Sequence, residues 1–88
     1  MVKRIRSVNG FIVQKSIVKG ERGVKIIFLM NGVFYAQSEY PIDVSDEQEK
    51  ELNDKLQEYT DINRQAKTMY DAVPLTTMIK SVADIILN

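Results

Sequence analysis

The sequence contains no cysteine and no histidine among its 88 residues. Without cysteine the chain can form no disulfide and no thiolate metal site. Without histidine it lacks the commonest general base, the usual pH-sensing side chain and the commonest transition-metal ligand. The serines and threonines therefore have no histidine to activate them. We expect a protein that is not an enzyme and that uses no metal and no cofactor.

Long apolar runs are also missing. No stretch approaches the ~20 apolar residues that span a bilayer. Residues 1–6 are basic, but the apolar stretch 11–13 that follows is too short for the core of a signal peptide, and no cleavage site of small residues comes after it. The apolar fraction of 44% and the charged fraction of 27% are ordinary for a soluble globular protein. We expect a cytoplasmic protein with no membrane partner.

Charge is present in equal amounts of both signs, yet the two signs are separated along the chain. Residues 1–40 carry a net charge of +5 and residues 41–88 a net charge of −5, so the whole chain sums to zero. The same boundary separates β-like from helix-like sequence. We interpret residues 1–88 as a single domain, with a basic β-sheet half (1–40) and an acidic helical half (41–88).

The basic half contains two Asn-Gly pairs, at Asn9 and Asn31, each between runs rich in Val, Ile and Phe. A two-residue type I′ turn needs positive φ at both central positions, which Asn and Gly tolerate best, so each pair predicts a hairpin. Residues 19–23 would join the hairpins. The expected fold class is α+β, with an N-terminal antiparallel meander of about four strands over 2–40. The predicted strands are 2–8, 11–18, 24–30 and 33–40.

The second predicted hairpin is apolar on both faces near its turn. Pairing outward from Asn31 and Gly32 sets Met30 against Val33 and Phe28 against Tyr35. Antiparallel sheets with one solvent-exposed face alternate apolar and polar residues along each strand, and this hairpin lacks that alternation. Helices can cover one face. The other face needs either the first hairpin curling over it or another protein chain.

The acidic half begins with a capping box, in which Ser45 is the N-cap and Gln48 stands three residues on. Heptad-like apolar spacing follows without Gly or Pro, and it predicts a long amphipathic helix over about 46–73 with Asn63 in its seam. A break near residues 60–61 is the alternative. Beyond Pro74, helical spacing predicts a short C-terminal helix over about 75–87. Asn63 would either set the register between two seams or be an exposed mid-helix residue.

A helix of ~27 residues is ~40 Å long, whereas a compact domain of this size is about 30 Å across. The overhanging seam must therefore be buried by the terminal helix folding back or by a second copy of the chain. Together with the spare sheet face, it predicts a homodimer that also binds a partner protein. The candidate partner and oligomer interface comprises Phe28, Met30, Tyr35, Leu52, Leu56, Tyr59 and Tyr70.

Two clusters of charge suggest other sites. The acids at the start of the predicted long helix lack the spacing of a calcium-binding loop, so we expect a solvated helix start. The basic sheet could instead bind nucleic acid or another anion, and this is the alternative function. Its candidate residues are Lys3, Arg4, Arg6, Lys19, Arg22 and Lys25.

In size, in its lack of Cys and His and in its dense charge, the chain resembles small accessory proteins of phages and mobile elements. The resemblance implies a non-enzymatic interaction protein. An inhibitor that occupies the nucleic-acid site of an enzyme would suit the acidic helix, because its closely spaced carboxylates can imitate the phosphates of a nucleic acid. Binding to a basic protein, weakened by salt, would follow from that role.

Overall fold

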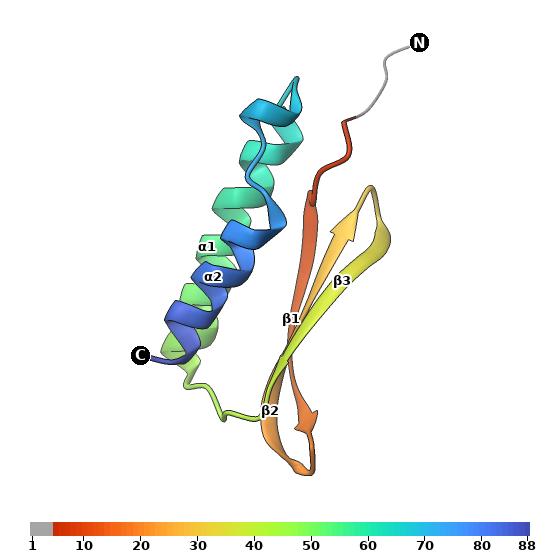
Figure 1. Cartoon of the computed structure of the whole chain (residues 1–88). Helices are drawn as coiled ribbons and strands as arrows, with labels where there is room; N and C mark the ends of the chain where they lie inside the picture. Colours follow the sequence, from red (N-terminus) through yellow and green to blue (C-terminus); the bar gives the residue numbers. More distant parts are fainter. Residues whose placement is uncertain (1–4) are drawn as a thin grey trace.

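Three antiparallel strands form a sheet of order β1-β2-β3, and two helices pack against one of its faces (Figure 1). The structure is a computed structural model that describes residues 5–88. The strands are β1 (Gly10–Val18), β2 (Glu21–Met30) and β3 (Val33–Tyr40); the helices are α1 (Asp46–Gln65), the short 3₁₀ helix η1 (Met69–Asp71) and α2 (Leu75–Ile86). The predicted α+β class, with a meander followed by helices, is confirmed. The described residues form three strands where about four were expected.

The turn at Asn31 and Gly32 forms as predicted. Both residues have positive φ, 53° and 80°, and Met30 pairs with Val33 across the turn. Farther from the turn the predicted register is wrong by one residue. A bulge next to Leu29 leaves Tyr35 without an opposite residue, so Phe28 pairs with Ala36. Such an extra residue bends the strand and changes the direction of the side chains beside it.

The predicted hairpin at Asn9 and Gly10 is wrong. The turn between β1 and β2 lies at Lys19 and Gly20, whose φ angles of 51° and 79° also fit a type I′ turn. The connection between the two strands is therefore residues 19–20, shorter than the predicted 19–23. Residues 5–8 form no strand, and residues 2–4 of the predicted strand 2–8 lie outside the described residues.

The strand register that follows from the turn at Lys19 and Gly20 explains why the chain turns there and not at Asn9 and Gly10. It places Phe11 opposite Phe28 and Val13 opposite Ile26, so two apolar rows share the face that the helices cover. Asn9 instead supports the other turn. Its amide nitrogen donates to Asn31 Oδ1 (2.8 Å), and its Oδ1 accepts from the Asn31 backbone N–H (2.9 Å).

Helix α1 begins with the predicted capping box. Ser45 Oγ accepts from the Gln48 backbone N–H (3.1 Å), and Gln48 Oε1 accepts from the Ser45 backbone N–H (2.9 Å). The predicted span 46–73 is wrong at its C-terminal end, because the helix stops at Gln65 and Ala66 is extended. The alternative break near residues 60–61 is absent as well: Thr60 is buried inside the helix, and its hydroxyl donates to the Leu56 carbonyl (2.9 Å).

Residues 66–74 reverse the chain, and α2 then runs antiparallel along α1 (Figure 1). α2 matches the predicted helix 75–87 to within one residue at its end. The apolar seam of α1 is thus covered by the terminal helix folding back and by the sheet. The core lies between the helices and one sheet face and consists of Val8, Val24, Ile26, Phe28, Val44, Leu52, Leu56, Met78, Val82 and Ile86.

Candidate functional site

The sheet face opposite the helices is left open by the described residues (Figure 1). Strand alternation and register place Ile12, Ile27 and Leu29 on this face together with Phe34. Lys25 and Glu39 lie across from each other on it, with Nζ and Oε1 3.8 Å apart. Sheets normally bury one apolar face and hydrate a polar one. Here the hydrated face keeps apolar side chains near the turn at Asn31 and Gly32.

A groove of about 180 Å³ lies at that end of the molecule. One wall is the segment leading into β1, with Arg6 and Ser7. A second is the end of the β2–β3 hairpin, with Met30 and Tyr35. The third is the segment from η1 to the start of α2, which includes Met69. Three parts of the chain that are distant in sequence therefore meet around one small apolar hollow.

Asn63 fixes two of these walls in place. Its side-chain nitrogen donates to the carbonyls of Val8 (2.6 Å) and Val73 (3.2 Å), and its Oδ1 accepts from the Val73 backbone N–H (2.7 Å). The residue is almost completely buried, and all of its polar atoms are used. Arg64 adds a hydrogen bond from Nε to the Asn9 carbonyl (2.9 Å). The C-terminal turn of α1 thus positions the groove.

Five exposed apolar side chains lie on the β2–β3 hairpin end and on η1, the two segments that supply Tyr35 and Met69 to the groove, and we refer to these five as the apolar end. They account for five of the nine large apolar side chains that are exposed among residues 5–88. Their exposed fractions are 67% for Val33, 59% for Phe34, 47% for Tyr35, 57% for Met69 and 100% for Tyr70. Clustering of this kind on a small surface is typical of a site that another molecule covers.

The structure separates the predicted interface residues into two groups. Met30 and Tyr35 line the groove, and Tyr70 follows the groove residue Met69 in the sequence. Phe28, Leu52 and Leu56 have no exposed surface in this structure and belong to the core instead. Tyr59 is half-buried, and its hydroxyl lies 2.7 Å from the Ser81 hydroxyl.

Sequence reasoning missed Ser7 and Met69 as parts of the site. Nothing in the local pattern marks Ser7, because its importance comes from the distant segments packed around it. Met69 falls within the predicted long helix 46–73, whereas the early end of α1 places it in η1. The exposed Phe34 was visible in the two-faced apolar pattern of the hairpin.

The candidate nucleic-acid residues are spread over several surfaces. Lys3 and Arg4 lie outside the described residues. Arg6 lines the groove, Lys19 is at the β1–β2 turn and Lys25 faces Glu39 on the open face. Within residues 5–88 these side chains do not gather into one basic surface.

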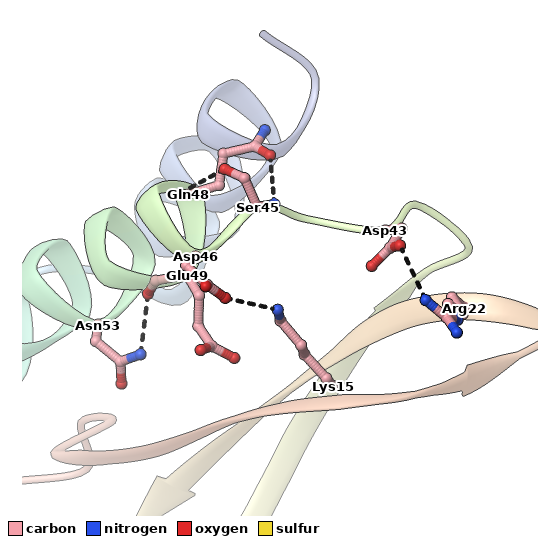
Figure 2. Close-up of polar contacts among 8 residues, drawn as sticks. All are labelled: Lys15, Arg22, Asp43, Ser45, Asp46, Gln48, Glu49 and Asn53. Carbon is pink, nitrogen blue, oxygen red and sulfur yellow. Dashed lines mark hydrogen bonds and ion pairs between the residues drawn. The ribbon is translucent and has the colours of Figure 1, made fainter.

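Two sheet bases are also paired with acids of the helical half (Figure 2). Arg22 lies 3.9 Å from Asp43, and Lys15 Nζ donates to Asp46 Oδ1 at 3.1 Å. The hydrogen bond to Asp46 raises the pKa of Lys15 above its ordinary value of 10.5. These pairs border a wide, open hollow of about 410 Å³ at the opposite end of the sheet from the groove. Its charged groups already neutralise one another.

No group of three acidic side chains within residues 5–88 is arranged to hold a metal ion. In the same part of the chain, neither helix combines the length and the apolarity that crossing a bilayer requires. Comparison of the chain with protein-family models, curated proteins and solved structures gives no significant match.

Proposed function

We propose that this chain is a non-catalytic protein-interaction module that works as a homodimer and binds a partner protein. The observation that carries the proposal is the apolar end, where exposed aromatic and aliphatic side chains lie on two segments that help to line a groove. Interfaces are enriched in Tyr, Phe and Met, and a few such residues provide most of the binding free energy. A fully exposed tyrosine next in sequence to the exposed Met69 fits such a contact better than it fits free solvent.

The partner proposed here is a basic protein, as an accessory or inhibitor protein of the phage type would have. Support comes from the outer face of α1, where Glu47, Glu51 and Asp54 are exposed. Of these acids, Asp54 has a lysine partner, Lys50, at 2.7 Å. Complementary charge of this kind accelerates encounter and orients the two proteins. Nucleic-acid binding receives less support, because the basic residues are dispersed and partly paired.

Sedimentation equilibrium of the full chain across the micromolar range tests the homodimer. We expect a mass of about 20 kDa, twice the 10.1 kDa of one chain, that falls toward the monomer on dilution. Phe34→Lys places a charge in the apolar end and should yield a monomer. A chain that remains monomeric throughout the range would contradict the proposal.

Ile17→Lys is the matched control. Ile17 is also exposed, at 69%, but it pairs with Arg22 near the opposite end of the sheet. The substitution adds the same charge to the same fold and should leave the dimer intact. If both variants dissociate equally, added positive charge is the cause, and the apolar end has no special role.

A further inference from the structure

Ser7 has a buried hydroxyl without a partner. The residue is 6% exposed and lines the groove, and its Oγ makes no hydrogen bond within residues 5–88. It is the one side-chain polar atom in that part of the chain that is both buried and unpaired. A hydroxyl shielded from water without a hydrogen bond costs free energy, so such groups normally have a partner. Because Ser7 Oγ has almost no exposed surface, a hydroxyl that enters the groove can bond it only after a small shift of the groove wall.

The size of the groove limits its occupant. Pockets for small molecules typically enclose about 300–1,000 Å³, whereas this groove has about 180 Å³. Apart from Ser7 and Arg6, its walls are mostly apolar side chains, including Met30, Tyr35 and Val73. It therefore suits one large side chain with a polar tip, held by a surrounding apolar rim.

Tyr70 has the matching chemistry and directly follows a residue of the groove wall. It is fully exposed, and its neighbour in sequence, Met69, forms part of the groove wall. Its ring is apolar and its hydroxyl can both donate and accept. The following residue, Asp71, is also exposed and is oriented by a hydrogen bond from the Thr68 hydroxyl to Oδ2 (2.9 Å). An aromatic residue followed by a carboxylate thus stands beside a groove lined by an apolar surface and an arginine.

We propose that the groove receives Tyr70 of a second copy of this chain, and that the two copies exchange this residue about a two-fold axis. A two-fold interface must be complementary to itself, so one surface has to carry both the inserted residue and its receptor. The groove and the apolar end, which share Tyr35 and Met69, supply both. In the dimer the Tyr70 hydroxyl pairs with Ser7 Oγ, and Asp71 faces Arg6 of the other copy. This assignment rests on the homodimer proposed above and names its contact.

Sedimentation equilibrium of point variants measures the contact. Tyr70→Ala removes two inserted rings per dimer and should raise the dissociation constant at least about 100-fold. Tyr70→Phe and Ser7→Ala should each raise it roughly tenfold, because only hydrogen bonds are lost. The double variant should be little worse than either single one, since both remove the same bond. Leu87→Ala, at another exposed apolar position, is the control and should leave the constant unchanged.

A mixing experiment separates insertion from general apolar adhesion. Ala72→Phe fills the groove and leaves Tyr70 in place; Met30→Trp is the substitute if circular dichroism shows that Ala72→Phe does not fold. When the two variants are mixed, the chain with the filled groove still has Tyr70 and can insert it into the open groove of the Tyr70→Ala chain. The mixed pair should associate at least about tenfold more tightly than either variant alone.

The outcomes distinguish this contact from the proposed function. A wild-type chain that is always monomeric overturns both. A wild-type dimer whose dissociation constant is unchanged by Tyr70→Ala, or variants that gain nothing by mixing, overturns the insertion of Tyr70 and leaves the homodimer standing. In that case the groove serves another partner or none.

Discussion

The two faces of the sheet carry similar apolar residues, but one face is buried and the other is exposed. On the face covered by the helices, Val24, Ile26 and Phe28 are fully buried. On the open face, Ile12 and Phe34 remain exposed within the described part of the chain. The difference lies in the covering elements: α1 and α2 together can shield one face of a three-stranded sheet. The covered face stabilises the fold of one chain, and the open face with the adjoining apolar end is available for assembly.

A pair of phenylalanine substitutions gives the largest expected contrast between the faces. Phe28→Ala should destabilise the chain by about 3–5 kcal/mol, because it leaves a cavity in the core. Phe34→Ala, on the neighbouring strand, should cost about 1 kcal/mol or less in the folding of one chain. Urea unfolding followed by circular dichroism measures both.

The same experiment also tests assembly. The wild-type unfolding midpoint should rise with protein concentration if the native state is a dimer, and Phe34→Ala should weaken that dependence. Phe28→Leu is a milder core variant that keeps the measurement possible if Phe28→Ala does not fold. Equal losses for the two alanine variants would mean that the faces do not differ as described.

The sequence was sufficient for features that are encoded locally. The Asn31 and Gly32 turn, the capping box at Ser45 and Gln48, and the helix after Pro74 each depend on a few neighbouring residues, and each was predicted correctly. The hairpin at Asn9 and Gly10 failed because a competing register buries more apolar surface on one face. Lysine at position 19 accepts a positive φ to allow that register.

The groove could not be predicted in the same way. It depends on where α1 ends, and the heptad-like spacing continued past Gln65 into residues that form η1. Just before the helix ends, the Asn63 side chain bonds Val8 and Val73, 55 and 10 residues away, and these bonds hold the reversed chain in place. The sequence predicted interface roles for Met30, Tyr35 and Tyr70 because neither predicted element could bury all of its apolar side chains. That these three residues come from segments meeting at one end of the molecule depends on this reversal of the chain.

Asn63 provides the second test, because it is a polar residue on the covered side of the molecule. Asn63→Leu leaves the Val8 carbonyl and both polar groups of Val73 without their partner, and should cost roughly 3 kcal/mol. Asn53→Leu is the matched control: its amide donates to the Glu49 carbonyl (2.9 Å) on the exposed face of the same helix. We expect a change within about 0.5 kcal/mol there. Thermal unfolding that gives similar values for both would show that Asn63 does not fix the walls of the groove.

The smallest expected effect concerns two lysines, one on each side of the sheet. Lys15 lies in register with Val24 on the helix-facing side and reaches Asp46, and this raises its pKa above 10.5. Its protonated form is therefore favoured by folding, so the stabilisation is complete below about pH 10.5 and is lost as pH rises through the raised pKa. Lys15→Met should flatten the fall in melting temperature on that alkaline side, and salt should reduce the difference because both groups are exposed to solvent. Lys25→Met, which removes the looser pair with Glu39 on the open face, is the control. If both variants follow the same pH profile, the Lys15 contact does not link the basic sheet to the acidic helix.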